Sequence, residues 1–292
     1  MLITWKYKDR GTFVYKLDPR TRLIFALAMM FSLIQFWDVR VHLIFLMLGL
    51  LQFRLARLTW REVKRAWMLV SVVVLMMTVI TFLTGRGGAG VISSEQRHLL
   101  ARLGPLPLGI FGWQMKLDVT AERIMFALSQ MMRVWAISSY AIIIPYTIDP
   151  ALYGVMFRGL GLPDKFAYAM DLSFRFVPSL GRDFTVTMDA QRARGYEVEK
   201  LTGGVLAQIR KLAPLIVPIT INAIVGAEDI IDAMDLRCFG VGPRTWVHRL
   251  QYQKRDWALI GFSAMVFVGT LLLNFFVCKG KLWIPPFLLS GW

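Results

Sequence analysis

Apolar residues along this chain are concentrated in five long runs, which cover residues 23–37, 41–53, 67–84, 124–147 and 257–278. A membrane-spanning helix needs about 20 predominantly apolar residues, and the last three runs meet this requirement. The first two runs are shorter, and only residues 38–40 separate them. We expect this pair to form a helical hairpin whose flanking Arg22 and Arg54 extend toward the lipid headgroups. The pattern predicts an all-α, multi-pass membrane protein.

Between the fourth and fifth runs the apolar residues follow a different pattern. Over residues 166–184 they recur at every third or fourth position, and the same spacing returns over 206–234, after Thr-Gly-Gly at 202–204. This spacing predicts two long amphipathic helices. Gly195 can take the left-handed conformation that ends the first helix, and residues 239–240 end the second.

The runs and the amphipathic segment divide the chain into three predicted parts. The first, 1–147, is a membrane bundle of about four spans. The second, 148–256, is a cytoplasmic module that contains both amphipathic helices, and the third, 257–292, is a last span with a tail.

Part of the second amphipathic helix could instead cross the membrane. Residues 212–227 carry no charge, but the stretch is only sixteen residues long and contains Pro214, Pro218 and Asn222. That length falls short of the hydrocarbon core. We therefore place it with the first amphipathic helix, and the membrane-spanning alternative stays open.

The chain is strongly basic, with 34 Lys and Arg against 19 Asp and Glu and a net charge of +15. Such an excess attracts any polyanion, including nucleic acid. However, 56% of the residues are hydrophobic, and membrane proteins collect Lys and Arg on their cytoplasmic side. Basic residues cluster before residue 23 and within 54–65, whereas the turn between them holds only Arg40. This distribution predicts a cytoplasmic N-terminus, an outer loop at 85–123 and a cytoplasmic segment at 149–256, with no need for nucleic acid.

The sequence offers no catalytic or metal-binding constellation. The three histidines are scattered, and Cys238 and Cys278 lie on opposite predicted sides of the membrane. The glycine-rich stretch at 85–90 lacks the Lys of a phosphate-binding loop. We therefore expect a non-enzymatic chain that binds no cofactor itself and takes its energy from a partner. An enzyme whose site is built from the loops is the less favoured alternative.

The two amphipathic helices end in similar sequences, DAQRARGY at 189–196 and DAMDLRCF at 232–239. Each places an Arg, Arg194 or Arg237, before a small residue and an aromatic residue. A cation at a helix C-terminus interacts favourably with the helix dipole, by about 0.3–1 kcal/mol, and this explains one occurrence. Two occurrences favour another role, in which each Arg at a helix tip enters a carboxylate-lined groove on another protein.

Several of these sequences are similar to those of a known family. They are GTFVYKLDPRTR at 11–22, residues 149–163, RFVP at 175–178, AQRARG at 190–195, and AMDLRCFG with GPRT within 233–245. Together they resemble the EcfT family, the transmembrane coupling subunits of energy-coupling factor (ECF) transporters, over nearly the whole chain.

The resemblance implies docking residues. In that family two Ala-Arg-Gly motifs end cytoplasmic coupling helices and dock into grooves on two ATPase subunits, which bind the ATP. The residues implied here are Ala193, Arg194, Gly195, Leu236, Arg237 and Cys238. The first three match the motif in full, and the second three keep only the Arg. Leu is larger than Ala and Cys adopts the left-handed conformation less readily than Gly, so the second contact suits a non-identical ATPase.

The resemblance also implies a moving partner. This partner is a small integral membrane substrate-binding (S) subunit that takes up a vitamin or a metal ion, in a bacterial or archaeal cell (inner) membrane. The alternative is the permease subunit of a conventional ABC importer, which would have its own substrate path and no integral substrate-binding partner.

Four further residues are candidates for structural or coupling roles. Asp18, Pro19 and Arg20 form a turn before the first helix, where Asp18 is expected to be the N-cap and Pro19 the first helical residue. Arg133 lies inside a predicted span. A charge at mid-membrane costs about 2.5–3.5 kcal/mol, so we expect Arg133 to face a polar partner, most simply a carboxylate.

Overall fold

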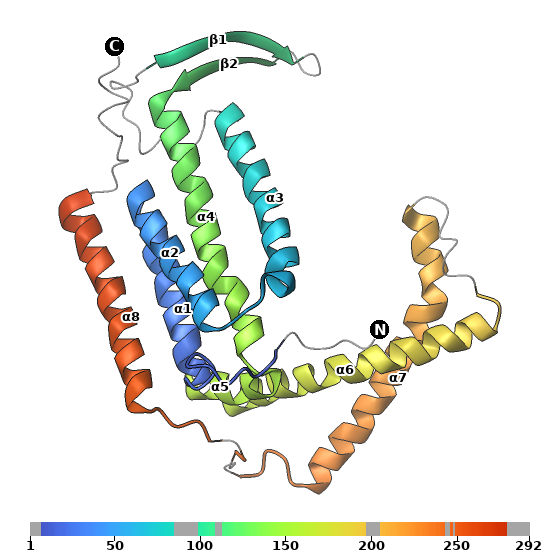
Figure 1. Cartoon of the computed structure of the whole chain (residues 1–292). Helices are drawn as coiled ribbons and strands as arrows, with labels where there is room; N and C mark the ends of the chain where they lie inside the picture. The colour runs from blue at the N-terminus through green and yellow to red at the C-terminus, as the bar shows by residue number, and fades with distance from the viewer. Residues whose placement is uncertain are drawn as a thin grey trace. The chain divides into compact units, whose positions relative to one another are not determined.

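The computed structural model describes residues 7–84, 99–108, 113–196, 205–242, 246–247 and 249–278 (Figure 1). Contacts between residues divide the chain into two units. We call Tyr7–Ile148 with Gln251–Trp292 the bundle unit, and Met1–Lys6 with Asp149–Leu250 the helix-pair unit. The last apolar helix therefore belongs to the same unit as the N-terminal helices.

The described helices of the bundle unit are α1 (Pro19–Ile34), α2 (Val39–Leu55), α3 (Trp60–Thr84), α4 (Ala121–Thr147) and α8 (Lys254–Leu273), which continues into a short π-helix (Asn274–Cys278). α4 contacts α1, α2 and α3, and α8 contacts α1. Short polar residues begin three of these helices. Asp18, Asp38 and Thr120 stand at the N-caps of α1, α2 and α4, where each side chain accepts a hydrogen bond from a backbone N–H of the first turn.

α2 and α4 approach one another closely at Gly49. A Cβ at this position would come within 3.0 Å of the Ser139 Cβ, so only a glycine lets α2 approach α4 this closely. Beside it, the fully buried Tyr140 donates its hydroxyl hydrogen to the carbonyl of Phe45 at 2.8 Å. The contact between α2 and α4 therefore combines close backbone approach with a satisfied polar group.

Within the described residues, four helical stretches are long and apolar enough to cross a membrane: Trp60–Phe82, Arg123–Thr147, Leu212–Leu236 and Lys254–Phe276. The first, second and fourth match the spans predicted from the sequence. α1 and α2 have 16 and 17 residues. At about 1.5 Å per residue they are shorter than the roughly 30 Å hydrocarbon core. The predicted class, an all-α polytopic membrane protein, is confirmed.

The length argument against a span in the second amphipathic helix is wrong. α7 (Val205–Leu236) continues through Pro214 and Pro218 and extends well beyond the charge-free stretch. A stretch of 25 residues within it meets the length and composition of a span. The membrane-spanning alternative therefore stands beside the first interpretation.

The predicted outer loop contains a hairpin that the sequence did not indicate. β1 (Leu99–Leu108) pairs antiparallel with β2 (Trp113–Thr120), and the register shifts twice along the pair. Glycine and prolines at 104, 105 and 107 break the alternation that usually marks a strand. The glycine-rich stretch at 85–90 lies outside the described residues.

The described part of the helix-pair unit contains a short 3-10 turn (Pro150–Leu152), α5 (Tyr153–Gly159), α6 (Asp164–Ala193) and α7. α5 packs on α6 so closely that a Cβ on Gly154 would lie 2.6 Å from the Asp171 Cβ. α6 and α7 contact one another and cross in the view of Figure 1. The Thr-Gly-Gly linker at 202–204 lies outside the described residues.

Candidate docking ends of α6 and α7

α6 ends in a hydrogen-bonded reversal of the chain at Gly195. This glycine has φ +82°, in the left-handed region. Its N–H donates to the Arg192 carbonyl at 3.0 Å, and the N–H of Tyr196 donates to the Gln191 carbonyl at 3.0 Å. These two bonds define the Schellman motif, which satisfies carbonyls that a helix end leaves unpaired. Arg194 occupies the capping position immediately before the reversal.

α7 ends in the same motif, in the same register. Cys238 takes the left-handed position with φ +53°, and its N–H donates to the Asp235 carbonyl at 2.9 Å. The N–H of Phe239 donates to the Met234 carbonyl at 3.0 Å. Because an L-residue in this conformation costs about 1–2 kcal/mol, the Cys keeps the geometry of a Gly at a penalty. The repeated sequence therefore encodes repeated backbone geometry, with an Arg, a left-handed residue and an aromatic residue in order.

Both tips are accessible. Arg194 and Arg237 are exposed, and within the described part of the chain neither guanidinium makes a hydrogen bond or ion pair. Leu236, beside Arg237, is 86% exposed, although a large apolar side chain is normally buried. Ala193 is exposed as well. These features fit the docking role that the resemblance implies for the motifs at 193–195 and 236–238. That role stays a prediction.

The two helix ends differ in charge. The last three turns of α7 carry four exposed carboxylates before Arg237: Glu228, Asp229, Asp232 and Asp235. The last three turns of α6 carry both signs: Asp183, Asp189 and Arg192, with Arg192 paired to Asp189 at 3.6 Å. Carboxylates are unfavourable near a helix C-terminus, so helix stability alone does not favour the acidic end of α7.

A hydrogen bond and an aromatic contact join α7 and its cap to α6. The Gln191 side-chain amide donates a hydrogen bond to the Pro214 carbonyl at 3.2 Å, so this carbonyl of α7 has a partner on α6. Phe239, the aromatic residue of the second cap, packs against Tyr168 with ring centroids 4.6 Å apart. The second aromatic residue of the repeated sequence therefore holds its cap against α6.

A buried polar cluster joins the beginnings of α1 and α8 in the bundle unit. Asp256 is 1% exposed, and its Oδ1 accepts the N–H of Asp18 at 2.9 Å. Its Oδ2 accepts the N–H of Gln253 at 2.8 Å. Asp18 in turn pairs with the Arg20 guanidinium at 3.2 Å, and that guanidinium lies 4.2 Å from the Tyr252 ring centroid. We call these residues the Asp18–Asp256 cluster.

The sequence located only half of this cluster. The structure places Asp18 at the N-cap of α1 with Pro19 as the first helical residue, but Asp256 and Tyr252 were not singled out. A Gln followed three residues later by an Asp at a helix start is a usable signal, because the acid at the third helical position often caps the preceding backbone. The contact between Asp18 and Asp256, which are 238 positions apart, has no such signal in the sequence.

Arg22 has a different environment from the one expected. It is buried, and its guanidinium donates to the carbonyls of Thr147 and Leu17. The expectation that Arg22 extends toward the headgroups is therefore wrong, because it joins the beginning of α1 to the end of α4.

Nearby, burial raises the pKa of Tyr15, whose protonated hydroxyl donates to the Tyr146 carbonyl at 3.3 Å.

Arg133 contacts an aromatic ring and an amide. Its guanidinium lies 4.2 Å from the Trp37 ring centroid and donates to the Gln130 side chain. Within the described residues it forms no ion pair with a carboxylate, which was the partner expected from the sequence. A cation over an indole ring gains about 0.5–2 kcal/mol, which offsets part of the cost of a charge inside a membrane span.

A family model described as cobalt transport protein (CbiQ) matches residues 11–244. The chain belongs to the CbiQ/EcfT family. Three relatives named energy-coupling factor transporter transmembrane protein EcfT support this membership. The relative from Acidaminococcus fermentans is 25% identical and the match covers 88% of this chain and 90% of the relative. That from Thermosediminibacter oceani is 24% identical over 92% and 97%. That from Thermanaerovibrio acidaminovorans is 27% identical over 92% and 95%.

Membership of the CbiQ/EcfT family makes this chain a membrane component of a transporter. The match reaches from the segment before α1 into both helix ends, so it includes the two Schellman motifs and Asp18. Within the described residues, no group of three His, Cys, Asp or Glu side chains is placed to hold a metal ion.

Proposed function

We propose that this chain is the coupling subunit of an ECF transporter, in which ATP-driven movement of two ATPase subunits passes through α6 and α7 to a substrate-binding membrane subunit. The observation that carries the proposal is the repeated helix end. Two long helices finish in the same Schellman motif, and each places an exposed Arg, Arg194 or Arg237, at the capping position. A planar guanidinium at a rigid tip suits bidentate pairing with carboxylates in a groove. The chain itself contributes no catalysis in this proposal, and ATP is bound by its partners.

The difference in charge between the two ends supports non-identical ATPases. A groove that accepts the end of α7 must have basic residues at its rim to meet Asp232 and Asp235, whereas the groove for α6 does not. Leu236 in place of a small residue also requires a wider apolar contact. Each groove would therefore reject the other helix end.

The substrate-binding subunit would contact the apolar sides of the two helices. Exposed apolar residues lie along both α6 and α7: Phe166, Phe184, Val186, Ile221, Ile224 and Val225. Such exposed apolar side chains suit contact with a membrane-embedded partner, which we expect to bind a vitamin or a metal ion. A cysteine at Ile224 should cross-link to that partner in the assembled transporter. Cross-linking only to lipid analogues would show that this side of α7 faces the bilayer instead.

The docking proposal is tested by charge reversal at the tips. Arg194→Glu and Arg237→Glu should leave membrane insertion intact, and together they should abolish co-purification of the ATPases and stimulation of ATP hydrolysis. Buried Arg anchors contribute about 2 kcal/mol or more to an interface, so each single variant should weaken association about 30-fold. Arg182→Glu, an exposed reversal further back on α6, is the matched control. ATPases that co-purify with the double variant at the wild-type level would refute the docking role.

Orientation is tested by labelling near the α6 tip. Ala190 is exposed and precedes the cap, so a cysteine there, in a chain with Cys238 and Cys278 replaced by serine, reports the side on which α6 ends. A membrane-impermeant maleimide should label it in inside-out vesicles and not in intact cells. Labelling in intact cells would place the helix end outside and would exclude contact with cytoplasmic ATPases.

A further inference from the structure

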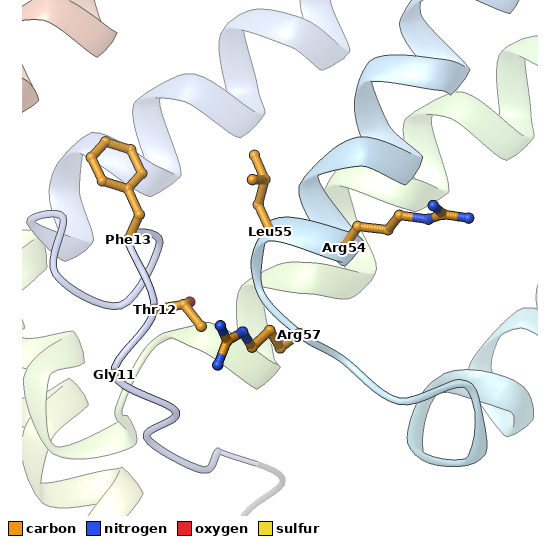
Figure 2. Close-up of a pocket in the computed structure, with 6 residues that line it drawn as sticks. All are labelled: Gly11, Thr12, Phe13, Arg54, Leu55 and Arg57. Atoms are coloured by element: carbon orange, nitrogen blue, oxygen red, sulfur yellow. The ribbon is translucent and has the colours of Figure 1, made fainter.

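A cavity of about 410 Å³ opens at one end of the bundle unit, where the segment before α1 meets the end of α2. Its lining residues are Gly11, Thr12, Phe13, Arg54, Leu55 and Arg57. Figure 2 shows the Arg57 side chain directed toward Thr12, whereas the Arg54 guanidinium points outward. The cavity therefore has one inward cation, one cation at its rim and two exposed apolar side chains, Phe13 and Leu55.

Arg57 holds an unusual backbone conformation. Its φ is +50°, and it occupies the left-handed position of another Schellman motif. The N–H of Arg57 donates to the Arg54 carbonyl at 3.0 Å, and that of Leu58 donates to the Phe53 carbonyl at 3.2 Å. Glycine fills this position in most helices because it lacks the Cβ that makes the conformation unfavourable. A long basic residue at a strained position points to a functional side chain. The Arg10 guanidinium fixes this turn by donating to the Arg57 carbonyl.

Two polar groups at the cavity have no partner within the described part of the chain. The Arg57 guanidinium makes no hydrogen bond or ion pair there. The Thr12 Oγ1 is buried and also makes no hydrogen bond. A buried hydroxyl and a nearby cation without partners form a donor pair suited to an anionic oxygen.

The position of the cavity indicates where such an anion would come from. α2 exposes apolar side chains along its length up to Leu55, including Met47 and Leu51, as expected of a helix against lipid. Trp60 begins α3 three residues after Arg57 and is exposed, which is typical of the headgroup level of a membrane. The cavity therefore lies where the lipid chains end and the phosphate groups begin.

We propose that this cavity binds the headgroup of an anionic phospholipid from the adjacent leaflet. The lipid phosphate pairs with the Arg57 guanidinium and accepts the Thr12 hydroxyl hydrogen, Arg54 adds attraction from the rim, and the acyl chains lie along Leu55 and Phe13. Basic pockets at helix ends recognise anionic lipids by this combination of charge and apolar surface. A lipid with a neutral headgroup lacks the net negative charge that pairs with Arg57. A soluble anion lacks the acyl chains that contact Leu55 and Phe13.

The test uses the purified full-length chain in neutral detergent, titrated with phosphatidylglycerol and followed by native mass spectrometry. Arg57→Gly removes the guanidinium and also relieves the strained φ, so its thermal stability should equal or exceed that of the wild type. Its affinity for phosphatidylglycerol should fall about tenfold, as expected for losing a hydrogen-bonded charge. Arg61→Gln, which removes an exposed charge on the first turn of α3, should change affinity by no more than about twofold because salt screens it.

Several results would overturn the proposal. Equal losses in the two variants would mean diffuse surface attraction without a site. Equal binding of phosphatidylcholine would exclude recognition of the anionic headgroup, and displacement of the lipid by inorganic phosphate would identify a site for a small soluble anion. If Arg57→Gly kept its lipid but lost co-purifying ATPase subunits, the cavity would serve a protein partner.

Discussion

Replacing Asp256 by alanine tests the Asp18–Asp256 cluster. The carboxylate is 1% exposed and accepts two backbone N–H groups, from Asp18 at 2.9 Å and from Gln253 at 2.8 Å. Asp18 is itself buried, so its N–H has no access to water when the acceptor is lost, whereas Gln253 is exposed and its N–H can be hydrated. The two bonds are therefore not equivalent.

The magnitude follows from that difference. A buried donor left unsatisfied costs about 1–3 kcal/mol, and loss of a cap at an exposed helix start costs about 1 kcal/mol. Asp256→Ala should therefore lower the free energy of unfolding by about 2–4 kcal/mol. Asp256→Asn retains one acceptor oxygen for the N–H of Asp18 but turns an N–H toward Gln253, so we expect about half of that loss.

The assay is reversible unfolding in mixed micelles, with helix content followed by circular dichroism as the denaturing detergent increases. Asp183→Ala, which removes an exposed carboxylate of α6, is the matched control and should change stability by less than about 0.5 kcal/mol. If Asp256→Ala unfolded at the same point as this control, the two hydrogen bonds would not hold the beginnings of α1 and α8 together.

Two further pairs of variants test backbone geometry described above, each by the same unfolding assay. Cys238→Gly should raise the free energy of unfolding by about 1 kcal/mol because glycine adopts φ +53° without strain. Cys238→Ala retains a Cβ and should give no gain. Equal effects of the two variants would contradict the strain argument. Gly49→Ala should lower stability by about 1–3 kcal/mol because its Cβ would press on Ser139, whereas Gly261→Ala, with no atom within 4 Å, should raise it by about 0.5–1 kcal/mol. A gain at Gly49 would show that α2 and α4 are not held at this distance.

The helices could be predicted from the sequence because their signals are local. Period and length identify α3, α4, α6 and α8, and an Asp before a Pro marks the start of α1. The sequence also shows that α6 and α7 end alike. The left-handed conformation behind this similarity could be predicted for only one of the two ends. Glycine at 195 suggests a left-handed residue, but a cysteine at 238 does not, since Cys has no preference for positive φ.

Contacts between distant segments could not be predicted. Arg133 contacts Trp37, which belongs to the turn between α1 and α2, and no periodicity connects the two residues. A basic residue that flanks an apolar run usually extends toward the lipid headgroups, and Arg22 was expected to do so. Its guanidinium instead donates to the carbonyl of Thr147, a contact that the sequence does not indicate. The hairpin of β1 and β2 was missed because β1 contains the glycine and prolines that normally end strands.

The length of α6 has a mechanical consequence. A helix of 30 residues extends about 45 Å, and its hydrogen-bonded cap stabilises the last turn. A swing of about 10° at the tip therefore displaces the opposite end by about 8 Å, close to the spacing of two packed helices. In the proposed transporter, a small closure between the two ATPase subunits would, through such a rotation, move a neighbouring subunit by about the distance between two packed helices.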